Sequence, residues 1–265
     1  TGQNHAIGVI IPDISNLFFA TVIEEIEAVA SRHKYTIMIS NTHENKVRER
    51  NALEYFSRHI VDGILLASTF DDYSELAPFL PPDIPLVFFD RVLKSCPYDS
   101  ITTISSPRIL QLLQQLPKEG HEKIGFIGNL PHLSTTMEHL KLYREVLDPL
   151  GLYQNGRYVR YASAIDDSGY TSAQALLVGG CTALFVASNV ATRGVLKCIL
   201  DAGLLPEKNI PVLAPYNADF LALTIRFFPM PQKELGQQAG QMILSRIQHP
   251  DASIQQIQLS SNMQL

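Results

Sequence analysis

The sequence predicts an α/β protein with two similar lobes, each built on a doubly wound, mostly parallel sheet. The first observation is an internal repeat, which indicates a duplicated structural unit. Its apolar runs do not alternate with polar residues, which is typical of parallel strands covered on both faces. Helical patterns separate the runs, which favours βαβ units. In the same order, residues 6–11, 63–68 and 83–87 are matched by residues 123–128, 183–188 and 209–213.

The expected strands are short, and each is bounded by a turn or a helical pattern. The first helix carries an apolar stripe of Phe18, Val22, Ile26 and Val29, spaced as one face of a helix. Further helices are expected at residues 53–60, 110–116, 140–150, 170–178 and 190–202. The strands are expected at residues 7–11, 36–39, 63–67, 86–89, 123–127, 184–187 and 212–214.

The last part of the chain does not follow the repeat. Residues 225–229 are interpreted as a connection, residues 232–247 as a long amphipathic helix, and residues 254–259 as a polar strand. Chains of this kind often pass between lobes more than once. The sequence alone does not say which lobe holds the final helix and strand.

Composition bounds the possible functions. The formal net charge is −5 and no basic stripe is present, so this chain alone is a poor nucleic-acid binder. The three cysteines, Cys96, Cys181 and Cys198, have no paired spacing, which indicates reduced thiols and a cytoplasmic protein rather than a disulfide framework or a zinc site. No catalytic nucleophile motif and no glycine-rich dinucleotide turn is present, so we expect neither an enzyme nor a cofactor.

No membrane or metal role is expected either. The polar start of the chain leads directly into a strand, without the pattern of a signal peptide. Residues 168–192 carry no charge, but Gly179 and Gly180 divide them, which favours a helix, a turn and a buried strand. The histidines are scattered, and no two stand at metal-ligand spacing beside a suitable third group.

Several motifs carry a family resemblance. They are residues 7–19 (IGVIIPDISNLFF), 61–64 (VDGI), 90–91 (DR), 120–128 (GHEKIGFIG), 130–134 (LPHLS) and 234–236 (ELG). In this order they resemble the regulatory core of lactose-repressor-family transcription factors, and the LPHLS motif is most similar to the branch of the fructose catabolite repressor and sucrose repressors. The resemblance extends over essentially the whole chain. It implies a type I periplasmic-binding-protein-like fold with a ligand cleft between two lobes, a fold shared with periplasmic sugar-binding proteins.

The resemblance also implies the domain organisation. We expect an N-terminal lobe at residues 5–104 plus 229–248, and a C-terminal lobe at residues 105–228 plus 249–265. Family members carry an N-terminal helix-turn-helix and a hinge helix that enter operator DNA. Residues 1–5 match the segment after that hinge, so the DNA-binding part is expected to be absent from this chain.

Candidate effector-binding residues of the first lobe follow its strands, because ligands of open α/β sheets bind beyond the carboxyl ends of strands. Asn16 offers an amide to sugar hydroxyls, and Phe18 and Phe19 offer rings to an apolar sugar face. The alternative is that Asn16 caps the first helix and the phenylalanines fill the core. Asp90 and Arg91 follow a strand. The Asp90 carboxylate can accept from adjacent hydroxyls, and the Arg91 guanidinium can donate to hydroxyl, carboxylate or phosphate oxygens. The alternative is an ordinary ion pair.

Two further candidates in the first lobe are Asp13 and Ser68. Asp13 is the weaker, because a carboxylate after a strand often caps the next helix. Ser68 ends the second repeated run of the lobe, again at the carboxyl end of an expected strand.

The second lobe departs from the family pattern at half of its customary polar contacts. His139 stands where the family usually places an arginine, four residues before an aromatic residue, here Tyr143. A histidine donates fewer hydrogen bonds and loses its charge near neutral pH. Thr135 and Glu138 fit a capping box at the start of the same helix. The other effector candidates, two of them at altered family positions, are Ser134, Ser188, Asn189, Tyr216 and Asn217, while Met230 replaces a customary glutamine.

These features predict a ligand-gated regulator. A sugar or sugar phosphate is expected to enter between the lobes, and ligand-induced lobe movement would modulate the binding of operator DNA. A homodimer is expected, with the exposed faces of the helices around residues 22–30 and 47–56 as candidate interface. The alternative is that the apolar residues of these helices belong to the core. The main alternative is a periplasmic sugar receptor of a transport system, and a third is a lobe pair that binds a protein partner. The sequence leaves open the identity of the effector and whether it induces or corepresses.

Overall fold

A computed structural model describes residues 4–58, 60–91, 93–104, 106–162, 167–215 and 222–260 of the 265-residue chain. Its backbone forms two compact units. The first unit draws on Thr1–Ile104 and Pro231–Leu265, and the second on Ser105–Met230. The second unit is thus a single continuous segment, whereas the first is assembled from both ends of the chain.

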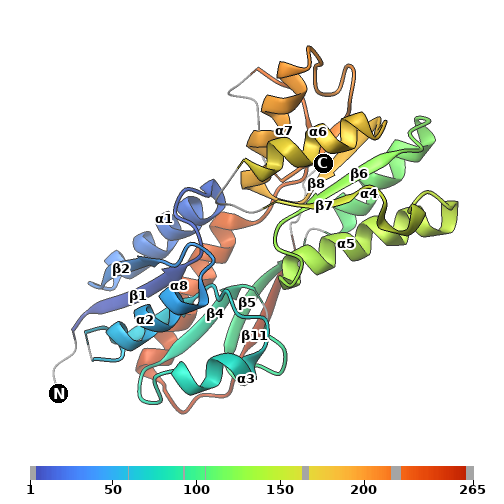
Figure 1. The fold of residues 1–265 in the computed structure, drawn as a ribbon. Helices are drawn as coiled ribbons and strands as arrows, with labels where there is room; N and C mark the ends of the chain where they lie inside the picture. Colours follow the sequence, from blue (N-terminus) through green and yellow to red (C-terminus); the bar gives the residue numbers. More distant parts are fainter. Residues whose placement is uncertain are drawn as a thin grey trace. The chain divides into compact units, whose positions relative to one another are not determined.

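The first unit contains a six-stranded sheet in the order β11-β5-β4-β3-β1-β2 (Figure 1). All five neighbouring pairs are parallel, as the apolar runs predicted. The interior strands β3 and β1 are buried along their whole length, which explains their continuous apolar sequences. The strands are β1 (Ala6–Ile11), β2 (Thr36–Asn41), β3 (Gly63–Leu66), β4 (Leu86–Asp90), β5 (Asp99–Ile104) and β11 (Gln256–Ser260).

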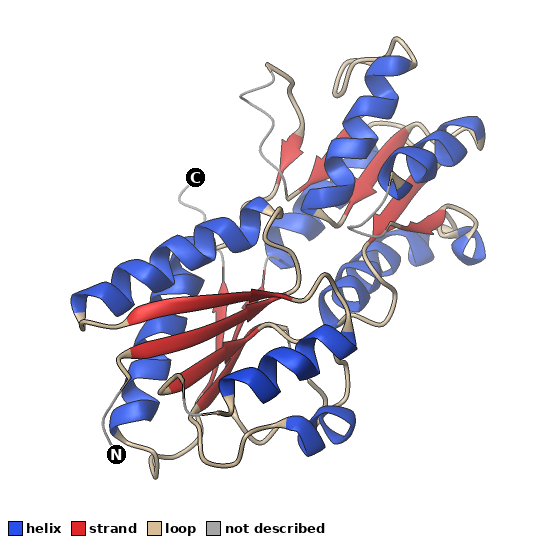
Figure 2. Ribbon diagram, turned by 60° about the vertical axis from the view of Figure 1, so that its left-hand side comes forward, coloured by secondary structure: helices blue, strands red, loops and turns tan. Residues whose placement is uncertain are grey.

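Helices cover both faces of this sheet (Figure 2). On one face, Leu53 and Phe56 of α2 and Leu76 of α3 pack with Ile64 and Phe88 in one buried cluster. The opposite face is covered by α1 and α8, and there the Cα of Gly63 lies close to the side chains of α8. The helices are α1 (Leu17–Arg32), α2 (Lys46–Phe56), α3 (Tyr73–Leu76), followed by a 3₁₀ turn (Ala77–Phe79), and α8 (Gln232–Gln248).

The second unit repeats the same topology with five parallel strands in the order β10-β9-β8-β6-β7. Read from the other edge, this order matches β2-β1-β3-β4-β5 of the first sheet, strand for strand. The internal repeat predicted from the sequence is therefore confirmed at the level of strand order. The strands are β6 (Ile124–Gly128), β7 (Val159–Tyr161), β8 (Ala183–Val186), β9 (Val212–Ala214) and β10 (Arg226–Phe227).

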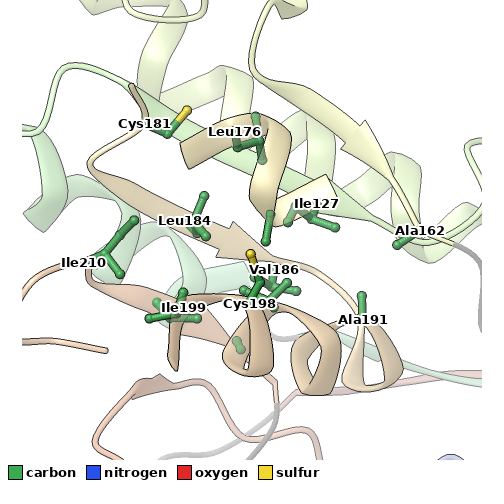
Figure 3. Close-up of a cluster of buried hydrophobic side chains, with 14 of the residues drawn as sticks. Ile127, Ala162, Leu176, Cys181, Leu184, Val186, Ala191, Cys198, Ile199 and Ile210 are labelled. Carbon is green, nitrogen blue, oxygen red and sulfur yellow. The ribbon is translucent and has the colours of Figure 1, made fainter. Parts of the chain in front are cut away.

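Two apolar clusters cover the two faces of this sheet. In Figure 3, Leu176, Leu184, Val186 and Cys198 belong to the cluster beneath α6 and α7. The other cluster joins α4 and α5 to alternate residues of the same strands, among them Phe185. The helices are α4 (Ser106–Lys118), α5 (Ser134–Leu147), α6 (Ser168–Val178) and α7 (Asn189–Asp201), with 3₁₀ turns at Asp148–Leu150 and Gln154–Gly156.

The C-terminal helix α8 packs closely along α1 (Figure 1). Two glycines permit this approach. A Cβ on Gly236 would lie 2.5 Å from the carbonyl oxygen of Val22, and a Cβ on Gly240 would lie 2.9 Å from the Cβ of Val29. The apolar stripe of α1 is consequently buried, so Val22, Ile26 and Val29 take the core role that the sequence left as an alternative.

The structure corrects several predictions at the ends of the sheets. Strands β5, β7 and β10 were not predicted, because they are short or rich in polar residues and have no continuous apolar run. Residues 249–265 were assigned to the second lobe. Strand β11 pairs with β5 in the first sheet, so the described part of that segment belongs to the first unit instead. The uncharged stretch at residues 168–192 is a helix, a turn and a strand, as predicted. Among the described helices, none has the length and apolarity needed to cross a membrane.

The contact between α8 and α1 gives a test of the packing. An alanine in the middle of a helix normally stabilises by about 0.5–1 kcal/mol relative to glycine. Gly236→Ala is expected to do the opposite and lower the free energy of unfolding by about 1–3 kcal/mol, because its methyl group overlaps the backbone of α1. Urea titration measures the difference. Gln241→Ala, at an exposed position of the same helix, is the control and should change stability little; a stabilised Gly236→Ala variant would disprove the tight contact.

Candidate ligand-binding site

The carboxyl edge of the first sheet gathers the candidates from three different strands. Asp13 follows β1, Ser68 follows β3, and Asp90 ends β4, with Arg91 next in the chain. Parallel strands end at the same edge of a sheet, so these loops are neighbours in space. A hydrogen bond from the Arg91 guanidinium Nη1 to the Ser68 carbonyl oxygen, at 3.1 Å, shows this directly for β3 and β4.

Asn16, Phe18 and Phe19 take the structural roles that the sequence left as alternatives. The Asn16 side-chain oxygen accepts a hydrogen bond from the Phe18 N–H at 3.1 Å and so caps α1. Both phenylalanines are buried, and Phe19 packs edge-on against Phe89 of β4. A ligand role for Asn16 would use its amide nitrogen, which capping leaves available. The two rings contribute mainly to the core.

Asp13 is buried and only half satisfied. Its Oδ1 accepts hydrogen bonds from the backbone N–H and the hydroxyl of Ser15, at 2.9 and 2.8 Å, in a local turn before α1. Its Oδ2 is buried and has no hydrogen-bond partner among the described residues. An unpartnered buried carboxylate oxygen is costly in a folded protein, which makes this atom a candidate acceptor for a ligand hydroxyl.

Arg91 is held by a carboxylate that the sequence analysis did not identify. Its Nη1 and Nη2 donate to the Glu44 Oε2 and Oε1 at 2.8 and 2.6 Å, in a two-pronged ion pair. Both side chains are 6% exposed, so the pair is buried. The ordinary ion pair considered as an alternative for Arg91 is therefore present. Glu44 lies in a polar stretch between β2 and α2, and nothing in that local sequence distinguishes it from a solvent-exposed residue.

A second carboxylate, Glu49 of α2, lies beneath the same edge and uses up the hydroxyl of Ser68. The Ser68 hydroxyl donates to the Glu49 Oε1 at 2.6 Å and accepts from the Phe70 N–H at 3.1 Å. The backbone N–H and hydroxyl of Thr69 donate to the Glu49 Oε2 at 2.6 and 2.5 Å. Burial raises the pKa of Glu49, and these hydrogen bonds oppose that rise. Ser68 thus fixes the loop after β3, and a ligand contact by its hydroxyl would have to replace one of these bonds.

Asp90 combines an unusual backbone with a buried charge. Its φ is +67°, a left-handed conformation that aspartate and asparagine tolerate better than most residues. Its Oδ2 lies 3.7 Å from the Arg91 Nε, which has no hydrogen-bond partner among the described residues. Burial raises the pKa of Asp90 to about 6, although Arg91 acts in the opposite direction.

In the second unit, His139 of α5 is part of an aromatic cluster. Its ring packs edge-on against Phe185 and Phe228, with centroid distances of 6.0 and 5.9 Å. Burial lowers the pKa of His139 to about 4, so the imidazole is neutral near pH 7. Its Nδ1 is buried and lacks a hydrogen-bond partner within the described part of the chain. The residue therefore offers one polar atom and no charge where the family usually has an arginine.

Ser188 and Asn189 lie at the start of α7. The Ser188 hydroxyl accepts from the Ala191 N–H at 3.3 Å and so caps the helix, and the half-buried Asn189 is the first helical residue. Ser134 begins α5 and has interaction partners of its own. The predicted sites at Tyr216 and Asn217 lie outside the described residues.

The predicted capping box at the start of α5 is wrong. The helix begins at Ser134, so its N-cap is Leu133, which has no oxygen in its side chain to accept a hydrogen bond. Thr135 is therefore inside the first turn. Glu138 instead accepts a hydrogen bond from the Ser106 hydroxyl of α4 at 3.1 Å. Met230 packs against the apolar cluster beneath α4 and α5.

The cysteines are unpaired. Cys181 and Cys198 are buried and Cys96 is half-buried. Burial raises the pKa of all three thiols, that of Cys181 to about 11, which keeps them protonated at neutral pH. Within the described ranges, no three His, Cys, Asp or Glu side chains are grouped as ligands of a metal ion.

Comparison with known proteins defines the class. The family model of the periplasmic binding protein-like domain matches residues 113–263. The catabolite control protein A of Priestia megaterium is 29% identical over 210 residues, covering 78% of this chain and 63% of that protein. The sucrose operon repressor of Klebsiella pneumoniae is 27% identical over 225 residues, covering 83% of this chain and 66% of that protein. A crystal structure of a putative ribose operon repressor from Burkholderia thailandensis superimposes with a TM-score of 0.81 at 27% identity, covering 97% of this chain and 98% of that one.

The chain belongs to the periplasmic binding protein-like domain family. Its relatives in these comparisons are transcriptional regulators of the lactose-repressor type rather than enzymes, which confirms the resemblance found in the sequence. The chain spans less than two thirds of the length of the catabolite control protein A that it matches.

The buried carboxyl of Asp90 predicts a pH-dependent stability. The pKa of Asp90 is higher in the folded protein than its ordinary value of 3.8. Between about pH 4 and pH 6, the folded state therefore keeps a proton on Asp90 that the unfolded state has released. This contribution to stability is present below pH 4 and is lost as the pH rises to 6. At pH 7, the contribution of Asp90 makes the free energy of unfolding about 3 kcal/mol lower than it is below pH 4.

Asp90→Asn removes this titration and suits the left-handed backbone. The change in the free energy of unfolding that this substitution causes is therefore expected to be more stabilising at pH 7 than at pH 4, by up to about 3 kcal/mol. Denaturant titrations at the two pH values measure the change. Asp83→Asn, at an exposed position before β4, is the matched control. An equal offset at both pH values would show that Asp90 is not the group responsible.

Proposed function

We propose that this chain is the effector-binding and dimerisation core of a sugar-responsive transcriptional regulator. The observation that carries the proposal is the buried carboxyl edge of the first sheet, where the Asp13 Oδ2 and the Arg91 Nε face no hydrogen-bond partner among the described residues. The Asp13 Oδ2 is an acceptor and the Arg91 Nε is a donor, and a sugar hydroxyl can both donate and accept. The family membership and the regulators among the relatives support the same function.

The proposed mechanism follows from the two-unit architecture. An effector that binds one conformation of the protein more tightly than another shifts the equilibrium toward that conformation. A coupling free energy of about 1–3 kcal/mol changes operator affinity about 5–150-fold. Operator DNA would be bound by a segment outside this chain, and the protein would act in the cytoplasm without catalysing a reaction. The relatives do not favour the alternative of a transport receptor.

The proposed homodimer would use the outer surface of β2 and α2. Ile39, Val47 and Tyr55 are 42%, 52% and 52% exposed, which is high for apolar side chains of this size. A shallow pocket of about 390 Å³ lies between these elements and is lined by Met38, Ile39, Tyr55 and Phe56, among others. Exposed apolar groups beside a hollow are typical of a protein–protein interface.

The effector proposal is tested with sugars. Neutral sugars and their phosphates at millimolar concentration are expected to raise the melting temperature if one is the effector, because a ligand that binds only the native state stabilises it. Asp13→Asn replaces an acceptor oxygen with a donor and is expected to weaken binding at least tenfold, measured by calorimetry. Asp83→Asn makes the same change at an exposed position and should bind normally. A broad panel without any shift would contradict the effector function.

The dimer proposal is tested by placing a charge on the α2 surface. Tyr55→Glu is expected to shift the protein from dimer to monomer in light scattering coupled to size exclusion, because a carboxylate would be desolvated in the interface. Val178→Glu is the matched control, since Val178 is 86% exposed on α6 of the other unit. A dimer that persists in Tyr55→Glu would place the interface elsewhere.

A further inference from the structure

We infer that the outer surface of α5 is a second site at which two copies of this chain associate. This surface lies entirely on the second unit, whereas the dimer surface proposed above, on β2 and α2, belongs to the first unit. Two apolar hollows and a pattern of charge that matches itself under two-fold symmetry carry the inference. It does not depend on the effector function.

Helix α5 has an inner and an outer stripe of residues. The inner residues, among them Tyr143, Val146 and Leu147, are buried in the apolar cluster that joins α4 and α5 to the second sheet. The outer residues recur at the intervals of three and four that place side chains on one face of a helix. They are Met137, Leu140, Lys141, Arg144, Glu145 and Asp148, and they line a shallow hollow of about 430 Å³.

A second hollow adjoins the first at Glu145. It has a volume of about 420 Å³ and lies between the C-terminal ends of α4 and α5, where Pro117 and Leu150 are among its lining residues. Met137, in the first hollow, is 52% exposed, and Leu150, in the second, is 56% exposed. Large apolar side chains left open beside hollows are typical of a surface that binds another protein.

The charges of the outer stripe are suited to self-association. Lys141 and Glu145 are exposed, and neither forms an ion pair or a hydrogen bond among the described residues. Arg144 is already engaged, because its Nε lies 3.3 Å from the Asp148 Oδ2 and its guanidinium lies 4.8 Å from the ring centroid of Tyr153. The stripe therefore offers one positive and one negative side chain, one helical turn apart, for contacts with another molecule.

An antiparallel pairing of α5 with α5 of a second copy uses all of these features. When the two-fold axis passes the helix at about residue 143, Lys141 of each copy faces Glu145 of the other, and two equivalent ion pairs form. The axis that places Met137 of each copy against Leu150 of the other lies within about 2 Å of that position along the helix. The polar and the apolar contacts thus require the same register. Each exposed apolar side chain is covered by its counterpart.

This association is expected to be weak. Exposed ion pairs add little affinity and mainly fix the register, and the surface offers two large exposed apolar side chains per copy. We expect half-association at about 100 μM, in the range of small, transient interfaces. That concentration lies above the low micromolar range of size exclusion, so the Tyr55→Glu test of the other surface is unaffected.

Sedimentation equilibrium of the native chain between about 5 and 500 μM tests the inference. The mass is expected to double with rising concentration, whether the species at low concentration is a monomer or the dimer proposed above. The same doubling is expected in Tyr55→Glu, which leaves α5 unaltered, so the two surfaces are tested separately. A Tyr55→Glu variant whose mass stays constant over the whole range would overturn the inference.

Charge reversal tests the contact itself. Lys141→Glu and Glu145→Lys are each expected to weaken the association at least tenfold, because each replaces two attractive contacts with two repulsive ones. A chain that carries both substitutions keeps the native net charge and is expected to regain the native association, because its ion pairs form again with exchanged polarity. Lys208→Glu, a charge reversal at another exposed position of the second unit, is the matched control and should associate as the native chain does. Single variants that associate normally, or a double variant that does not recover, would overturn the assigned contact.

Discussion

A parallel sheet has to be covered on both faces, and this constraint determines most of the structure. Its strands expose apolar side chains in both directions, so each crossover must carry a helix and the helices must lie on both sides. The same topology brings every strand-to-helix loop to one edge. Polar residues that are far apart in the sequence, such as Arg91 and Glu44, therefore meet there without any local sequence signal that joins them.

Buried charge at that edge is balanced by an ion pair. Arg91 and Glu44 satisfy one another, and their geometry offsets the cost of removing both from solvent. Glu49 is held by hydrogen bonds to Ser68 and Thr69 instead. These groups of the edge are therefore paired internally, whereas the Asp13 Oδ2 and the Arg91 Nε have no hydrogen-bond partner among the described residues. Specificity in such a site depends more on the unpaired atoms than on the number of charges.

The sequence predicted the parts of the fold that leave a periodic signal. Continuous apolar runs identified β1, β3, β4, β6, β8 and β9, and the helical stripes identified the long helices, because burial of both faces dictates those patterns. Edge strands such as β7 are partly exposed and carry no such pattern. In the site, strand ends identified Asp13, Asp90 and Arg91. Glu44 could not be found, because its burial results from tertiary contacts with Arg91 and not from its neighbours in sequence. The capping box failed because α5 starts two residues earlier than its threonine and glutamate suggested.

The placement of α8 and β11 has a consequence for biosynthesis. One face of the first sheet lacks α8, and β5 remains an open sheet edge, until α8 and β11 have left the ribosome. The second unit is encoded by one uninterrupted segment and is complete well before that. Domains generally fold as units during synthesis. The middle of this polypeptide therefore reaches its native state first, and the nascent N-terminal portion waits, partly exposed, for its C-terminal complement.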